Sequence, residues 1–328
     1  MRNLLTSFLT LLLFAVFLSS CQPELSAPPT TEPDPVTVDS TLLIKSITYT
    51  YHTFDSSETL GVSKETYTYD TTNRKIMVSV TNDAYGDAEY VFNYDVDHNL
   101  THVDYTYPGI SGIFNLIISY DASGVLSNMR EVHPDGTITN TTFTKTVMGS
   151  RYELSWSGSP DEFSASVHEA DGTILSYSHI FHPNSDPSQA WKSSDFYSYG
   201  SLGNVDQIVN RFNSPVDAPP VEEVTYQVYT RATSGDNLYN LRKLLYGARL
   251  HKLVVNGREN DIPLLTGLQF EPMIDEPHSR YPALTGKSHG YTFNNLVVID
   301  NLNRLRRFRS FAVDIPIFAI DHAIEYYK

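Results

Sequence analysis

The chain has 328 residues, a formal net charge of −15 and a single cysteine. An acidic surface repels nucleic acid and anionic lipid headgroups, so we expect no nucleic-acid partner. One cysteine excludes an intrachain disulfide and any metal site built from several thiolates, so the stability of the fold must come from its core.

Residues 1–20 have the pattern of an export signal. Arg2 supplies a positive charge, residues 4–18 are almost wholly apolar, and small residues precede Cys21. The apolar stretch is short for a membrane-spanning helix, which needs about 20 residues. Residues 18–21, Leu-Ser-Ser-Cys, resemble the lipobox of bacterial lipoproteins. That resemblance implies cleavage before Cys21 and lipidation of its thiol; the alternative is an ordinary signal peptide with an unrelated cysteine.

The lipobox implies a protein of the cell envelope, anchored in the membrane through its N-terminal lipid, and we expect the outer membrane. Residues 21–41 are rich in Pro and Thr and contain no aromatic side chain, which predicts an extended tether. Residues 42–328 then form the folded part.

Hydrophobic residues alternate with polar ones from Leu42 onward, and this period of two predicts strands with one buried face. Tyr and Phe, which favour strands, number 22 and 16. The clearest segments are residues 47–51, 66–69, 76–80, 90–94 and 116–120.

A turn motif recurs at the ends of these strands. After Tyr69, Tyr94 and Tyr120 comes an Asp, then a turn containing Asn or Gly, then an apolar residue. Asp caps such a turn and Gly or Asn accepts a positive φ, so each copy predicts a hairpin. Looser copies occupy residues 132–138, 169–175, 199–205 and 299–305, and together they predict a meander.

The period changes in two places. Residues 236–247 carry Leu238, Leu241 and Leu245 at helical spacing and end on Gly247, which predicts one short helix. Residues 267–290 contain three prolines and show no period, which predicts a long irregular loop, the kind of segment that often carries function.

The turns around Asp70, Asp95, Asp121 and Asp300 resemble those of a family of uncharacterised Bacteroidota-type lipoprotein domains with a porin-like β fold. They resemble more distantly the Tyr-Asp repeats of secreted polymorphic-toxin shells. The resemblance covers the chain from Leu42 onward and carries over no catalytic residue. It implies an all-β fold: a large antiparallel meander sheet, curled or closed into a barrel-like form, with one short helix.

An integral outer-membrane barrel is the alternative. It would have strands of about ten residues with an apolar lipid-facing side and aromatic girdles, and the predicted strands fit this in part. A lipid on Cys21 would make a second anchor redundant, and the sequence ends Tyr326-Tyr327-Lys328 rather than on an aromatic residue.

Few residues are candidates for a site. Asp275, Glu276, His278 and His289 in the irregular loop combine carboxylate and imidazole, which bind zinc, but they lack a recognised spacing, and a solvated loop is the alternative. His179 and His182 are candidates of the same kind, with a strand position as the alternative.

Two further groups have structural alternatives. Asp95, Asp97 and Asn99 have the oxygen spacing of a calcium loop but lack its Gly and Glu, so a hairpin turn is the preferred interpretation. Trp156 and Trp191 are candidates for stacking on sugar rings, with core packing as the alternative for each.

No nucleophile elbow, phosphate loop or dinucleotide motif is present, so we expect no enzyme activity and no cofactor. The preferred hypothesis is a non-catalytic β domain that binds a ligand or partner in the envelope, either a glycan or a protein. The alternatives are a structural spacer of the envelope and, third, a hydrolase.

Overall fold

The computed structural model describes residues 43–53, 58–83, 86–159, 161–183, 187–200, 203–235, 237–250, 281–288, 291–312 and 319–327. All of them fall in one compact unit, Asp39–Lys328. The signal segment, Cys21, the tether and most of the irregular loop lie outside the described residues.

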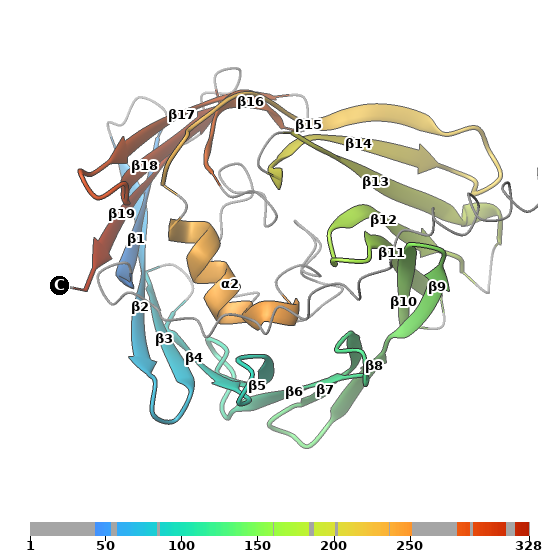
Figure 1. Cartoon of the computed structure of the whole chain (residues 1–328), viewed down its shortest axis with the longest axis horizontal. Coiled ribbons are helices and arrows are strands. Elements are labelled where there is room, and N and C mark those ends of the chain that lie inside the picture. The colour runs from blue at the N-terminus through green and yellow to red at the C-terminus, as the bar shows by residue number, and fades with distance from the viewer. Residues whose placement is uncertain are drawn as a thin grey trace, which may run out of the picture. The chain divides into compact units, whose positions relative to one another are not determined.

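Nineteen strands of these described residues form a single sheet in which every pair is antiparallel (Figure 1). They follow one another as a meander, as the Tyr-Asp turns predicted. They are β1 (Ile44–His52), β2 (Thr59–Asp70), β3 (Lys75–Asn82), β4 (Ala88–Tyr94), β5 (Leu100–Tyr105), β6 (Phe114–Tyr120), β7 (Leu126–Val132), β8 (Ile138–Thr142), β9 (Thr144–Met148), β10 (Arg151–Ser159), β11 (Glu162–Glu169), β12 (Ile174–Phe181), β13 (Trp191–Tyr199), β14 (Val205–Asn213), β15 (Val221–Arg231), β16 (Ala283–Ser288), β17 (Tyr291–Ile299), β18 (Leu305–Ala312) and β19 (Ala319–Tyr326).

The two ends of the meander meet. β1 pairs with β2 on one side and with β19 on the other, which brings the sheet close to a full barrel. Phe143 alone separates β8 from β9, and its amide donates to the Ser127 carbonyl at 2.9 Å. β8 pairs with β7, and β9 pairs with β10. The prediction of an all-β sheet curled into a barrel-like form is confirmed.

The Tyr-Asp turns share one backbone geometry. In the turn 121–125 the Asp121 amide donates to the Val125 carbonyl at 2.7 Å, and the Gly124 amide donates back to the Asp121 carbonyl at 2.9 Å. The fourth residue of the turn, Gly124, has a φ of 78°, the left-handed conformation that closes a three-residue hairpin loop. The same pair of bonds recurs in the turns 95–99, 133–137, 169–173 and 300–304.

Most of these turns lie at one end of the barrel, which we call the turn end; the opposite end is the loop end. The turns 95–99, 121–125, 169–173 and 300–304 lie at the turn end, where they join β4 to β5, β6 to β7, β11 to β12 and β17 to β18. Leu43 lies there too, since its carbonyl accepts a hydrogen bond from the Tyr327 amide at 3.0 Å. The turn 133–137 joins β7 to β8 and lies at the loop end.

Tyrosine hydroxyls tie neighbouring strands together at the turn end. The Tyr120 hydroxyl donates to the carbonyl of Leu100, the first residue of the preceding strand, at 2.8 Å. Tyr69, Tyr199 and Tyr326 make the equivalent bond to the first residues of β1, β12 and β18. The tyrosine of the motif therefore satisfies a strand-end carbonyl that the ladder leaves free.

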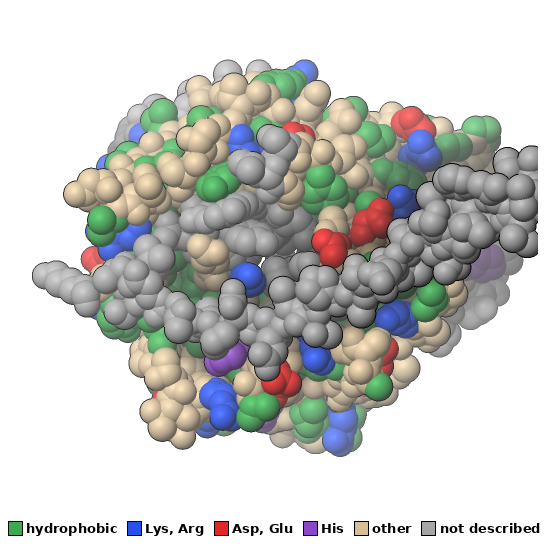
Figure 2. All heavy atoms as spheres, in the orientation of Figure 1, with side chains coloured by type: hydrophobic (Ala, Val, Ile, Leu, Met, Phe, Trp, Pro, Cys, Tyr) green, Lys and Arg blue, Asp and Glu red, His purple; other side chains and the backbone are tan. Residues whose placement is uncertain are grey.

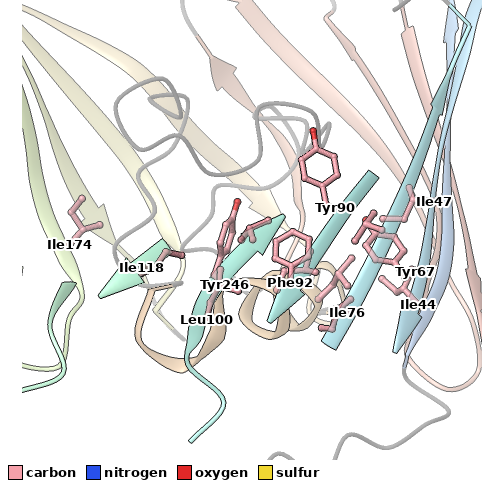
Figure 3. Close-up of a cluster of buried hydrophobic side chains, with 14 of the residues drawn as sticks. Ile44, Ile47, Tyr67, Ile76, Tyr90, Phe92, Leu100, Ile118, Ile174 and Tyr246 are labelled. Carbon is pink, nitrogen blue, oxygen red and sulfur yellow. The ribbon is translucent and has the colours of Figure 1, made fainter. Parts of the chain in front are cut away.

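Alternation divides the sheet into a buried inner face and an exposed outer face. On β3, Ile76 and Val78 are buried whereas Met77 and Ser79 are exposed. The buried positions of nearly all the strands join one hydrophobic cluster, which also contains side chains of the helix inside the ring (Figures 1 and 3). On β2–β4 the exposed outer positions are mostly polar: Lys64, Thr68, Lys75, Ser79 and Glu89. In the end-on view of Figure 2, charged and hydrophobic side chains are intermingled over the rim of the ring.

The predicted short helix is present as α2 (Asn237–Leu250). It extends three residues beyond the expected stop, but Gly247 is non-helical, with φ 73° and ψ 171°, so regular helix does end where the sequence indicated. Leu245 and Tyr246 pack into the core, with Tyr246 near Leu100 in Figure 3. No helix among the described residues is long and apolar enough to cross a membrane.

One expectation is wrong in part. Residues 267–290 were expected to form one irregular loop, yet Ala283–Ser288 is strand β16, paired with β15 and β17. The segment Ala-Leu-Thr-Gly-Lys-Ser has no clear alternation, so its two neighbours rather than its own pattern hold it in the sheet.

Candidate functional site

The two tryptophans lie in different surroundings. Trp156 is 4% exposed, and its ring centroid is 5.3 Å from that of Phe143 and 6.0 Å from that of Tyr177. It is a core residue and offers no face to a ligand. Trp191, by contrast, is only partly buried, at the start of β13.

Trp191 is the centre of an aromatic ledge on the inner face of β12–β14. Its ring centroid lies 5.2 Å from that of His179, 5.9 Å from that of Phe181 and 6.0 Å from that of Phe212. All three rings are tilted by 38° or less to the indole, so the four form a nearly continuous surface. Phe212 is 41% exposed. We call these four residues the aromatic ledge.

Polar side chains follow the ledge on the same face, one step toward the turn end. Asn210 donates from Nδ2 to Ser193 Oγ at 2.9 Å and to Asp195 Oδ1 at 2.7 Å. On the neighbouring strands, Ser164 Oγ lies 3.1 Å from both the Tyr177 hydroxyl and His179 Nδ1. The inner wall of β11–β14 therefore presents an aromatic surface bordered by hydroxyl, amide and carboxylate groups.

A second aromatic row, on β4–β7, is more enclosed. Tyr90, Tyr105 and Phe114 stack with centroid separations of 5.8 and 5.0 Å, and Tyr90 and Phe114 are buried. The Tyr105 hydroxyl donates to the Glu131 carboxylate. Burial, and then that carboxylate, raise the pKa of Tyr105 well above its usual value. This row packs the wall and has little free surface.

Glu65 is a buried carboxylate, a group that can act as an acid or base in catalysis. It is fully buried on the inner face of β2, and the hydroxyls of Tyr49 and Tyr67 both donate to its Oε2. Burial, and then the charge of Glu65, hold the pKa of Tyr67 above its usual value. A carboxylate that is wholly enclosed cannot reach a substrate, so this group contributes to packing.

The candidate metal ligands His179 and His182 lie in different surroundings. His179 belongs to the ledge, whereas His182 is exposed beyond the end of β12. In the described ranges no group of three or more His, Cys, Asp or Glu is placed to hold a metal ion. Asp275, Glu276, His278 and His289 lie outside the described residues.

The suspected calcium spacing is a hairpin turn. Asp95 Oδ1 accepts the amides of Asp97 and Asn99, each at 2.9 Å, and Asp95 Oδ2 accepts from Asn99 Nδ2 at 3.0 Å. Both side-chain oxygens of Asp95 therefore accept hydrogen bonds that close the turn.

A cleft of about 410 Å³ opens at the turn end. Three turns contribute its walls, at residues 123–125, 149–151 and 170–172, and Arg249 of α2 closes one side. Lys145 and Tyr152 line it from β9 and β10. Glycine stands in each of the three turns with a positive φ, so little side chain narrows the opening.

His168 lies beneath this cleft, stacked on Tyr152 with ring centroids 5.0 Å apart. Its Nδ1 lies 3.1 Å from the Gly172 carbonyl and must therefore carry the proton, which leaves Nε2 to accept from Ser166 Oγ at 2.7 Å. The neutral ring is thus fully satisfied. Burial lowers the pKa of His168 to about 4, although the bond to Gly172 acts in the opposite direction.

We expect the free energy of unfolding to fall as the pH is lowered from 6.5 to 4. In this window the His168 side chain is protonated in the unfolded chain but stays neutral in the folded protein, so acid favours the unfolded state. At about 1.4 kcal/mol per pKa unit, the loss approaches about 3 kcal/mol at pH 4. Urea titrations of the wild type and of His168→Gln measure it, and the variant should have the flatter profile. His182→Gln, at an exposed position, serves as the control; an equal flattening there would contradict the assignment.

Sequence reasoning identified Trp191 but missed its partners. Phe181 and Phe212 come beside Trp191 only through the registers of β12, β13 and β14, and no local pattern encodes a register. The cleft was missed for the same reason, because its lining comes from four separate segments.

The comparisons with known proteins concern the fold. The structure is similar to that of a porin-like protein from Bacteroides uniformis, with 12% sequence identity and a TM-score of 0.38, over 87% of this chain and 98% of that one. It is also similar to a porin-like protein from Bacteroides vulgatus, with 9% identity and a TM-score of 0.32, over 87% and 98% of the two chains. No family model and no curated protein matches the sequence.

Proposed function

We propose that this chain is a non-catalytic glycan-binding domain of the cell envelope, and that the aromatic ledge is its sugar site. The observation that carries the proposal is the partly exposed pair Trp191 and Phe212, set side by side on the inner face. Flat aromatic faces are complementary to the apolar faces of pyranose rings, and they lose little conformational entropy on binding.

The polar groups beside the ledge match the rest of a sugar. Ser193, Asp195 and Asn210 are held by one another, so their positions are fixed before a ligand arrives. Hydroxyl, carboxylate and amide groups at fixed positions are the side chains that recognise sugar hydroxyls. The enclosed state of Glu65 gives no support to the hydrolase alternative.

The proposed location is the outer membrane, to which a lipid on Cys21 would anchor the domain. The lipobox-like segment and the Pro- and Thr-rich tether support this.

We expect at least one oligosaccharide of a panel to bind, and Trp191→Ala to weaken that binding by roughly five- to thirtyfold. Loss of one stacked ring accounts for about 1–2 kcal/mol. The panel comprises soluble cello-, xylo-, manno- and chito-oligosaccharides, and the measurements are isothermal titration calorimetry and quenching of tryptophan fluorescence.

Phe196→Ala is the matched control. Phe196 is on the same strand as Trp191 but on the opposite face, and it is 37% exposed. It should bind sugar as the wild type does. Absence of binding across the panel by the folded wild type would favour the spacer alternative. An equal loss of sugar binding in both variants would show that the aromatic ledge is not the sugar site.

A further inference from the structure

The cleft at the turn end contains two cations, Lys145 and Arg249, that form no close ion pair with a carboxylate of the described residues. Lys145 Nζ lies 3.0 Å from Ser123 Oγ and 5.0 Å from the centre of the Tyr152 ring. Arg249 packs against Gly124, where a Cβ atom would lie 2.7 Å from its Cζ. Because Ser123 and Gly124 are consecutive, the two cations flank a single turn.

The other charges of the cleft are already engaged. Arg151 lies 3.1 Å from Glu169 through its Nη2. Asp171 accepts the amide of Thr173 at 2.9 Å. Asp121, which accepts from Ser123 Oγ at 2.7 Å, interacts electrostatically with Lys145, but within the described part of the chain no carboxylate lies within 4 Å of Lys145 or Arg249. Both cations therefore remain available to an anionic ligand in a protein whose net charge is −15.

We propose that this cleft binds a phosphomonoester, with the phosphate between Lys145 and Arg249 and its organic group against the exposed side chain of Val147. A phosphomonoester carries about −1.5 to −2 charges at neutral pH, which matches the two cations. The guanidinium offers a planar fork and the ammonium a compact charge, and both are established phosphate donors.

The volume indicates a ligand larger than the phosphate itself. A cavity of about 410 Å³ is within the range of about 300–1,000 Å³ that small-molecule sites occupy. Val147 and Tyr152 line its apolar side, and Ser150 and Asp171 line its polar side. A sugar phosphate and a lipid headgroup both supply this chemistry.

Two probes distinguish these sources. Glucose 6-phosphate is titrated by calorimetry, and sedimentation is measured with phosphatidylcholine vesicles that contain phosphatidic acid, against vesicles of phosphatidylcholine alone. Binding of the sugar phosphate alone identifies a soluble ligand, and binding of the acidic vesicles identifies a headgroup; either supports the proposal. The affinity should fall as the ionic strength rises.

We expect Lys145→Gln combined with Arg249→Gln to weaken binding at least tenfold. Lys64→Gln combined with Arg211→Gln removes the same charge from exposed positions outside the cleft and should bind as the wild type does. Lys145→Gln alone should show an intermediate loss, and Trp191→Ala should leave this site unchanged, because it is separate from the sugar site. Binding of neither probe, or equal weakening by both double variants, would overturn the proposal.

Discussion

Gly247→Ala is expected to lower the free energy of unfolding by about 3 kcal/mol and to release α2 from the sheet. Gly247 has φ 73° and ψ 171°, a conformation that side chains disfavour. A Cβ atom there would lie 2.7 Å from the His98 carbonyl oxygen and 2.8 Å from the Leu100 nitrogen. Both are backbone atoms of a hairpin and cannot move aside. Urea titration gives the stability, and hydrogen exchange in residues 237–250 reports the release.

Gly136→Ala separates the two causes of that loss. Gly136 also has a positive φ, of 86°, but a Cβ atom there would meet nothing within 4 Å. Its cost should be limited to the backbone strain, about 1–2 kcal/mol, with no change in exchange from α2. Equal losses in the two variants, or unchanged exchange in Gly247→Ala, would show that α2 does not depend on this close approach.

Asp321→Asn should destabilise the protein by about 3 kcal/mol and open the seam where the barrel closes. Asp321 is 7% exposed on β19. It accepts from Arg309 Nε at 2.9 Å and Arg307 Nη2 at 3.2 Å, and His52 Nε2 of β1 lies 3.4 Å away. Burial alone would raise the pKa of Asp321, but the arginine bonds hold it below its usual value. The carboxylate therefore remains charged and joins three strands.

An exposed ion pair is the control for that substitution. Arg211 and Glu222 lie 2.7 Å apart, but their side chains are 47% and 54% exposed. Glu222→Gln should cost no more than about 0.5 kcal/mol, because water screens such pairs. Thermal unfolding of the two variants side by side measures the difference. If Asp321→Asn were as mild as Glu222→Gln, the ion cluster would not hold the seam.

Local sequence features predicted most of the fold. The alternation at residues 76–80 and the Tyr-Asp turn after Tyr120 depend on neighbours in the chain, and both appear as expected. The spacing of the leucines predicted the helix. The sequence did not predict β16, because Ala283–Ser288 is held by flanking strands rather than by its own pattern.

The site was harder to predict because it depends on the registers between neighbouring strands. Trp191 stood out as a rare residue, but nothing near it in the chain indicates Phe212 or Asn210. Tyr94 illustrates the limit: its hydroxyl turns to the Leu245 carbonyl at 2.9 Å, whereas Tyr69 and Tyr120 keep the motif's bond to the preceding strand. Only the docked helix, 151 residues away in the chain, explains that change.

The position of β1 has a mechanical consequence. Its residues are hydrogen-bonded to β2 on one side and to β19 on the other, and in the sequence it follows the segment for which we predict a tether. If the proposed lipid anchor holds the chain, a pull from the membrane would run along the strand and strain both ladders in shear, so their bonds would share the load instead of opening one at a time. A domain tethered through a free edge strand would unzip under a smaller force.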